Sequence, residues 1–376
     1  MIRQNCRSIS LALVSPILLM GVSLPCALLR GEEDLATKLQ QAKVEQFAQS
    51  PAYADAPVCC NSVLYFGGNG FWKVQPDGPV KAFALSPSGA VVRQEQDLLL
   101  CGTGLKALLN FAPDGKVHVL ADKFEEHPLN SLNDVTIDAQ GRIYWTDPVG
   151  SSREKVIGKV FRLTPDGTVK QVIGNLAFPA GIEVDPTGKS LVIIESQTNR
   201  VLKYSVPEND DSFGEPSVLY DIGGAGGDGC AFDAEGNLWL ADFHRKETGQ
   251  GRVTVVSPEG KLVGHVNVPA KVVSNIAFGG ERFDEVYCTT AEPPAVFRIE
   301  AGVVGFAGHR APQVAFQKEI DVKSLSKGGV LRPRKLSRLE KRRLRQMKPD
   351  QKPGLSGLIL QKWTASWSEF KTTWSR

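Results

Sequence analysis

The stretch Asn133–Pro148, NDVTIDAQGRIYWTDP, has the pattern of two short strands joined by a tight turn. Both apolar runs are rich in β-branched and aromatic residues, and the letters AQG separate them. The first strand nevertheless opens on Asn133 and Asp134, an amide beside a carboxylate, and such residues are depleted from strands. The position where this strand begins is therefore expected to serve something other than strand formation.

The same phrase recurs further along the chain. The aspartates that close the first strand, Asp138, Asp185 and Asp233, are 47 and 48 residues apart, and each is followed by a turn ending in Gly and by three more strand patterns. A period of about 40–50 residues with four strands per unit is typical of propeller blades. With weaker copies on both sides, the repeat predicts an all-β fold, a six-bladed β-propeller over 54–308. The alternative, a β-sandwich, does not account for the regular turn.

The N-terminal residues resemble a secretory signal. Arg3 and Arg7 precede an apolar run, which is the usual layout of an export leader. We expect 1–30 to be a signal peptide or membrane anchor, and the protein to be exported, periplasmic or secreted. An uncleaved leader would hold it on the membrane. Between leader and propeller, helical spacing of apolar residues predicts a short helical linker over 31–53.

The C-terminal end differs in charge from the body. From Lys323 onward there are 15 Lys and Arg against 3 Asp and Glu, a net of +12, which leaves −9 for the other residues because the whole chain carries +3. We expect 309–376 to be a basic extension, partly helical and partly disordered, with an amphipathic helix at 358–375. Contact with a membrane surface or an anionic polymer fits export, whereas nucleic-acid binding does not.

The cysteines of the chain do not predict a disulfide framework. Outside the leader the chain has five cysteines, without C-x-x-C spacing, which argues against a zinc site and a disulfide scaffold. A single bridge and buried free thiols both stay open.

Propeller geometry accounts for the polar residues of the opening stretch. The first strand of each blade lines the central channel, so its first residue lies at the channel mouth. Asn133, Ala180, Asp228 and Ser274 are then equivalent positions around one ring, and Asp55 opens the first blade. Oxygen ligands of this kind suit a hard divalent cation. The alternative is that these side chains only hydrogen-bond turn backbone.

Several phrases, in order, resemble the senescence marker protein/gluconolactonase family. These are NSLNDVTIDAQGRIYWTDP, the segment FPAGIEVDPTGKSLVIIESQTNRV, the segment GGDGCAFDAEGNLWLA, and SNIAFGG. The resemblance covers about residues 54–308. It implies a six-bladed, calcium-dependent lactonase that acts on a small-molecule lactone or sugar-like substrate.

The resemblance also implies site residues. Asp228 matches the family's metal-ligating aspartate, which also acts as acid and base. Asp55 stands at the place of a ligating glutamate, and Asn133 matches a substrate-contacting amide beside the metal, with Asn130 as its companion. The family's other ligating asparagine is Ala180 here, so the metal site is incomplete. We therefore expect metal ligands at Asp228, Asp55 and Asn133.

Loops at the mouth supply further candidates. Arg153 and His244 could meet a hydroxylated or acidic substrate. The glycine-rich segment 223–229 lacks the Lys-Ser/Thr pair of a phosphate loop. Neither H-E-x-x-H nor G-x-S-x-G occurs, which leaves zinc-protease and serine-hydrolase functions without support.

These observations predict an exported, metal-dependent hydrolase that opens sugar-type lactones at the channel mouth. Two other hypotheses stay open. One is a non-catalytic ligand- or partner-binding propeller with a decayed metal site. The other is a metal-free hydrolase similar to strictosidine-synthase-like propellers. Ala180 favours both of these.

Overall fold

The computed structural model describes residues 34–94, 96–209, 213–224, 226–243 and 249–320. The expected leader over 1–30, the candidate residue His244 and the expected amphipathic helix at 358–375 lie outside the described residues. Among the residues that are described, no helix has both the length and the apolar character needed to cross a membrane.

Six antiparallel sheets make up nearly all of the described chain, and each contains four strands of the repeat. Sheet one has β2 (Asp55–Cys60), β3 (Val63–Gly67), β4 (Phe71–Gln75) and β5 (Gly78–Phe83); sheet two has β6 (Ala90–Gln94), β7 (Asp97–Gly102), β8 (Ala107–Phe111) and β9 (Val117–Ala121); sheet three has β12 (Val135–Ile137), β13 (Ile143–Asp147), β14 (Gly158–Leu163) and β15 (Val169–Leu176). Sheet four has β16 (Pro179–Val184), β17 (Ser190–Glu195), β18 (Arg200–Ser205) and β19 (Ser217–Asp221); sheet five has β20 (Gly227–Phe232), β21 (Leu238–Asp242), β22 (Arg252–Val256) and β23 (Leu262–Asn267); sheet six has β24 (Val273–Gly279), β25 (Glu285–Ala291), β26 (Pro294–Glu300) and β1 (Lys43–Gln49). Two short elements lie between strands of the repeat. The 3-10 turn η1 (Thr103–Leu105) lies between β7 and β8, and a hairpin of β10 (Lys123–Phe124) and β11 (His127–Pro128) lies between β9 and β12.

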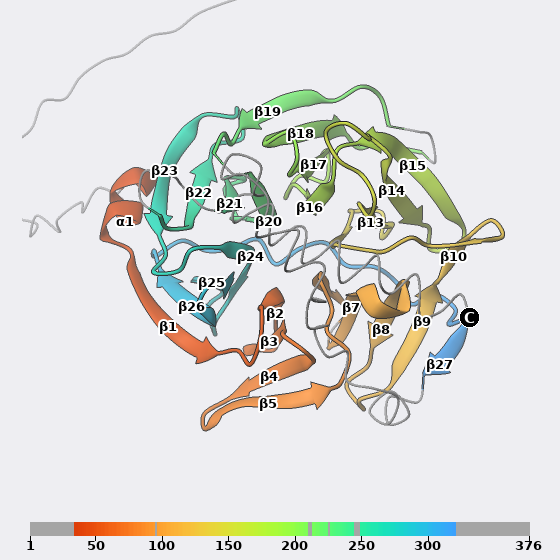
Figure 1. Cartoon of the computed structure of the whole chain (residues 1–376), viewed down its shortest axis with the longest axis horizontal. Coiled ribbons are helices and arrows are strands. Elements are labelled where there is room, and N and C mark those ends of the chain that lie inside the picture. Colours follow the sequence, from red (N-terminus) through yellow and green to blue (C-terminus); the bar gives the residue numbers. More distant parts are fainter. Residues whose placement is uncertain (1–33, 95, 210–212, 225, 244–248, 321–376) are drawn as a thin grey trace, which may run out of the picture. The chain divides into compact units, whose positions relative to one another are not determined.

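The first strand of every sheet faces a common centre. In order, β2, β6, β12, β16, β20 and β24 each contact the next, and β24 contacts β2 again, so the ring closes. Figure 1 shows the six sheets arranged around this centre as blades. The six-bladed propeller predicted from the repeat is therefore confirmed.

The ring closes through a strand from the N-terminal side of the chain. β1 pairs with β26 and becomes the outer strand of sheet six, next to the last strands of the propeller. The helix α1 (Leu35–Gln41) precedes it, and its buried Leu39 packs on β23. The region 31–53, expected to be a helical linker, thus holds the helix together with one strand of the propeller itself. Sequence patterning missed β1 because only one of its residues, Ala48, is buried.

A C-terminal segment crosses the face of the propeller opposite the mouth. It begins after β26, where the Phe306 amide donates to the Phe232 carbonyl, and it ends in β27 (Lys318–Ile320), which pairs with β9 as a fifth strand of sheet two. On the way Ala311 and Val314 are buried. The propeller fold therefore continues past the expected boundary at 308. Figure 1 shows this blue segment running across the centre.

Side chains between neighbouring blades form the core. Trp145 and Phe161 stack at 5.7 Å between ring centroids and pack against Leu99 and Leu108 of the preceding blade. Burying a ring of that size removes roughly 150–250 Å² from water. Blade-to-blade packing, together with the strand ladders, thus holds the ring closed. All five cysteines of the described chain are buried free thiols.

The repeated turn aspartates explain the regular spacing. Asp233 has no solvent exposure and accepts hydrogen bonds from the amides of Glu235 and Asn237, from the Asn237 side chain and from the Trp239 indole. An acceptor with two oxygens at this place satisfies the turn backbone and orients the next strand. The D-x-x-G phrase is therefore a structural device at the face opposite the mouth.

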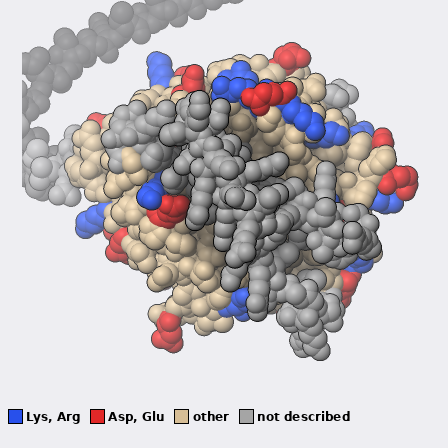
Figure 2. Space-filling view, viewed as in Figure 1, with Lys and Arg blue, Asp and Glu red and all other residues tan. Residues whose placement is uncertain are grey.

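Charges on the described surface are mixed in sign. Figure 2 shows acidic and basic side chains lying beside one another around the rim of the visible face. Among the described residues seen in this view, no large patch of a single sign gathers.

Candidate functional site

Two of the predicted site residues, Asp55 and Asp228, come together although 173 positions separate them in the chain. Asp55 opens β2 and Asp228 lies near the start of β20, and both are buried. The Tyr53 hydroxyl donates to Oδ2 of Asp228 over 3.3 Å. The negative charge of Asp228 raises the pKa of Asp55, which places the two carboxyls in one electrostatic environment. Asp55 and Asp228 therefore lie in one buried environment.

A third carboxyl, Asp134, belongs to the same cluster. Its Oδ1 accepts from the amide of Val135 over 2.9 Å, and its charge raises the pKa of Asp55. Sequence reasoning placed the neighbouring Asn133 here and passed over Asp134. The signal was present, since the opening pair is an amide beside a carboxylate. We call Asp55, Asp134 and Asp228 the mouth carboxylates.

Burial dominates the electrostatics of the mouth carboxylates. Desolvation raises the pKa of Asp228 to about 7, against a lowering by the Tyr53 hydroxyl, and raises the pKa of Asp134 to about 7. Desolvation, followed by the charge of Asp228, raises the pKa of Asp55 well above its ordinary value. Three carboxyls that share one desolvated site cannot all ionise without a compensating positive charge. The cluster therefore either holds protons or recruits a cation.

The predicted substrate-binding amides have different surroundings. Asn133 is buried and directly precedes Asp134 in the chain, and its backbone N–H donates to the Thr146 carbonyl over 2.9 Å. Asn130 is engaged in the loop itself: its side chain donates to the Val149 carbonyl, and its backbone amide donates to Asp147 Oδ2 over 2.8 Å. Asn130 thus holds the mouth loop in place, while Asn133 stands next to the mouth carboxylates.

Arg153 and Ala180 complete the predicted set within the described residues. Arg153 is exposed and donates twice to the Gln197 carbonyl, over 3.0 Å from Nε and 2.7 Å from Nη2. It thereby links the mouth loops of blades three and four. Ala180 is fully buried, and its carbonyl accepts from the Thr146 hydroxyl over 2.8 Å. At the position where the resemblance places an amide ligand, this chain has the buried methyl group of Ala180.

Sequence reasoning missed four further polar residues of the channel: Asn275, Tyr53, Thr136 and Glu183. Burial raises the pKa of Asp55 and Asp134, and the nearby buried Asn275 side chain opposes that rise in both. Tyr53 pairs with Asp228. Deeper along the same strands, the Thr136 hydroxyl donates to Oε1 of Glu183 over 2.9 Å, and burial raises the pKa of Glu183 to about 8. The sequence SNIAFGG contained Asn275, but only the fold shows which carboxyls it meets.

The donor chemistry of the mouth carboxylates fits a hard divalent cation. They present oxygen atoms only, they are buried, and among the described ion pairs none joins a Lys or Arg to Asp55, Asp134 or Asp228. A closed cage is not preformed, because the described residues contain no three acidic, His or Cys side chains already converging at ligand positions. Flexible coordination completed by water is what calcium tolerates among the divalent ions.

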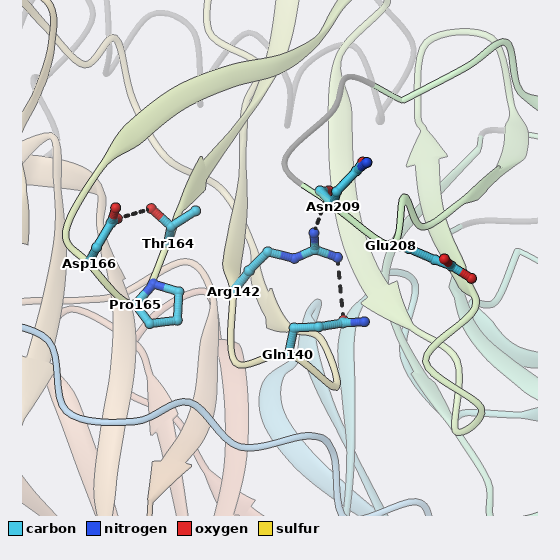
Figure 3. A pocket seen from close by; sticks show the side chains of 7 residues that line it. All are labelled: Gln140, Arg142, Thr164, Pro165, Asp166, Glu208 and Asn209. Atoms are coloured by element: carbon cyan, nitrogen blue, oxygen red, sulfur yellow. Dashed lines mark hydrogen bonds between the residues drawn. The ribbon is translucent and has the colours of Figure 1, made fainter.

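A separate hollow of 450 Å³ lies on the opposite face, between blades three and four (Figure 3). Arg142 lines this hollow, but its guanidinium already donates hydrogen bonds to Asp138 Oδ2 at 2.6 Å and to the carbonyls of Pro207 and Asn209, both at 2.8 Å. This arginine fastens a loop and has little capacity left for an anionic ligand. The mouth carboxylates remain the candidate site. The hollow is lined by Gln140, Arg142, Thr164, Pro165, Asp166, Glu208 and Asn209.

Comparisons with known proteins agree with this geometry. Residues 61–292 match the family model described as SMP-30/Gluconolactonase/LRE-like region. The chain is 30% identical to lactonase drp35 of Staphylococcus epidermidis over 199 residues, which are 50% of this chain and 58% of that protein. It is also 30% identical to regucalcin of Xenopus laevis over 227 residues, covering 58% of this chain and 71% of that one.

Among solved structures, a protein assigned to the gluconolactonases superposes with a TM-score of 0.62 at 26% sequence identity, covering 70% of this chain and 94% of the other. The matched stretch spans more than half of the lactonase relative and less than two thirds of it. The family model covers 61–292, which is most of the propeller and more than half of the chain. The chain belongs to the SMP-30/gluconolactonase/LRE-like family.

Proposed function

We propose that this protein is an exported, metal-dependent hydrolase that opens sugar-type lactones at the mouth of the propeller channel. One observation carries the proposal: Asp55, Asp134 and Asp228 share a buried site with no described basic partner. Membership of a lactonase-containing family supports the choice of a cyclic ester as substrate. The layout of residues 1–30 supports export.

Asp228 is the proposed acid and base. Ring opening adds water to the ester carbonyl, breaks the C–O bond of the ring and transfers one proton to the departing alkoxide. Burial raises the pKa of Asp228 to about 7 in the protein without a cation, and a cation bound there would favour the ionised carboxylate, which can accept the proton of the attacking water and return it to the alkoxide. Tyr53, which donates to Oδ2, holds the carboxyl in one orientation.

Asp55, Asp134 and Asp228 are the proposed cation ligands. When bound, a divalent cation such as calcium supplies Lewis-acid polarisation of the lactone carbonyl. Asn133 stands beside the site and is the proposed substrate-orienting amide. Asn130 is proposed to act through the loop it fastens. His244 and Arg153 remain proposed substrate contacts.

A binding propeller without catalysis is the second candidate function, and Ala180 favours it. Ala180 is fully buried and has a methyl group in place of the amide that the family resemblance implies at this position. In that case the mouth carboxylates would hold protons, which relieves their mutual repulsion, and they would not bind a cation.

Two measurements separate the candidates. The first is thermal melting of the whole chain with calcium, magnesium, manganese or zinc added singly. A cation present at 100 times its dissociation constant adds about 2.7 kcal/mol of stability. The second is a pH-stat assay on a panel of lactones, with Asp228→Asn as the test and Asp114→Asn as an exposed control. Loss of turnover in the first variant alone supports the lactonase; no melting shift and no turnover support the binding propeller.

A further inference from the structure

The connection between β1 and β2 (50–54) crosses blade six on the mouth side before the chain enters blade one. The Ser50 amide donates to the first carbonyl of β26 over 3.1 Å, and the Ala54 amide donates to the Thr290 carbonyl of β25 over 3.2 Å. The Ala54 carbonyl accepts from the Ser274 hydroxyl of β24 over 2.6 Å. The β1–β2 connection is therefore fastened to the three other strands of blade six in turn, from the outer side to the channel.

Ser274 is the innermost of these fastening points, and it has no role in the proposed function. It is the ring position of blade six that corresponds to Asp228 in blade five, but it is completely buried, and its Oγ also lies 2.9 Å from the Thr289 hydroxyl. Because its single hydroxyl hydrogen is donated to a main-chain carbonyl in a buried site, losing that bond leaves the carbonyl unsatisfied. Ser274 therefore holds Ala54 in place.

Ala54 lies between two residues of the mouth. Before it, Tyr53 is half-buried and donates its hydroxyl to Oδ2 of Asp228 over 3.3 Å, which joins the β1–β2 connection to blade five. After it, Asp55 is the first residue of β2 and one of the mouth carboxylates. Because peptide units are planar, fixing both the N–H and the carbonyl of Ala54 fixes the directions in which its neighbours leave it.

We propose that Ser274 is a positioning residue for lactone opening, which fastens the β1–β2 connection so that Tyr53 holds the Asp228 carboxyl in the orientation that proton transfer requires. Ser274 itself contacts neither the substrate nor the reacting atoms. The inference rests on the proposed function for the role of Asp228, but the hydrogen bonds that carry it belong to the protein itself. It also gives β1 a second task, because the strand that closes the ring by pairing with β26 brings the connection across blade six to the mouth.

The first experiment measures kcat and KM of the full chain with the lactone of the panel that the wild type opens fastest. Ser274→Ala is expected to lower kcat by about 10- to 100-fold, with a smaller change in KM, because a slight misplacement of a catalytic group can cost about 100-fold. Ser274→Thr, which keeps a hydroxyl, is expected to retain the wild-type kcat. A wild-type kcat in Ser274→Ala, or an equal loss in both variants, would overturn the inference.

Two matched controls remove hydroxyls at the opposite end of the propeller. Tyr144→Phe removes a phenol hydroxyl that donates to Asp138 Oδ2 over 2.8 Å, as Tyr53→Phe does at the mouth. Thr164→Ala removes a hydroxyl that donates to a main-chain carbonyl over 3.1 Å, as Ser274→Ala does. Both controls are expected to lower the melting temperature and leave kcat unchanged. An equal loss of kcat in the controls would show a general effect of destabilisation and contradict a positioning role.

A double-variant cycle tests whether Ser274 acts through Tyr53. The kcat values of Ser274→Ala, Tyr53→Phe and the double variant are compared with that of the wild type. The double variant is expected to lose less than the product of the two single losses, because both changes release the same carboxyl. Losses that multiply would show independent roles and overturn the inference. Should Ser274→Ala fail to fold, Ser274→Cys, whose thiol is a weaker donor, replaces it in the cycle.

A last arm separates this inference from the proposed function. If the wild-type chain opens no lactone of the panel, the proposed function fails. The same four proteins are then compared by unfolding in denaturant. A midpoint shift of the double variant that is smaller than the sum of the single shifts shows that Ser274 fastens Tyr53. Simple additivity of the midpoint shifts overturns the inference.

Discussion

The propeller places aspartates at both ends of its inner strands, and the two sets differ in how they are satisfied. At the turn end, Asp233 and Asp138 each accept four or more hydrogen bonds from the turn and the next strand. At the mouth, Asp228 accepts from Tyr53, and its described neighbours include two other carboxyls. The same residue type accepts four described hydrogen bonds at the turn end and fewer at the mouth, where Asp55 accepts from the Ala56 amide and Asp134 from the Val135 amide.

The difference shows where the fold can support chemistry. A buried carboxylate surrounded by donors is stable in its charged form and has no spare capacity. Buried carboxylates that face one another retain the capacity to bind a proton or a cation, at a cost to stability. The repeat that makes the turn aspartates recur therefore also brings the mouth carboxylates together, with fewer described donors around each of them.

The largest expected effect is on activity. Asp228→Asn should lower lactone turnover by about 100- to 10,000-fold, because an amide cannot accept and return the proton. The fold should persist, since only one described side-chain hydrogen bond is altered. Initial rates across the lactone panel measure this, with melting as the check on folding. Turnover equal to wild type would remove Asp228 from its role.

The next effect is on stability at the opposite end. Asp233→Ala should cost about 3 kcal/mol or more, because it leaves the Trp239 indole, the Asn237 side chain and two turn amides without an acceptor in a buried site. Denaturant unfolding measures it. If Asp233→Ala lowers the free energy of unfolding as little as the exposed Asp114→Ala does, the hydrogen bonds of Asp233 do not stabilise the turn end, and the contrast with the mouth fails.

A pH dependence should distinguish the two ends. Asp134 and Asp228 have folded-state pKa values of about 7, above the ordinary value of 3.8. In chelator their contribution to stability is fully present below about pH 4 and is lost as the pH rises towards 7. Saturating cation should abolish this loss, because it compensates the charges. Melting temperature against pH, with and without cation, tests it; stability rising from pH 4 to 7 in chelator in step with these groups would contradict it.

The smallest effect expected is a gain. Asp134→Asn in chelator at pH 8 should raise stability by about 1 kcal/mol, because one of three mutually repelling charges is gone. The same change should weaken cation binding. Equilibrium unfolding of this variant beside Asp114→Asn isolates the effect. A destabilised Asp134→Asn would show that the hydrogen bonds of Asp134 outweigh the repulsion.

Much of the architecture could be predicted from local pattern. The spacing of Asp138, Asp185 and Asp233 and the alternation of apolar residues predict blades, since each blade is a local antiparallel sheet. β1 could not be predicted in its place, because it pairs with β26, more than 240 residues away in the chain. The segment leading to β27 was likewise assigned to the extension, although it crosses the far face of the ring.

For the site, the chain by itself determined which residue types stand at the strand ends: Asp55 and Asp228 are polar where a strand begins, and Ala180 is not. Only the tertiary structure decided that Asp134 shares the buried environment of Asp55 and Asp228, and that Asn275 lies over Gly229. The reason is physical. A strand pattern specifies which residues alternate, but the neighbours of a channel residue come from other blades, and ring closure and a local irregularity of register set the direction of each side chain.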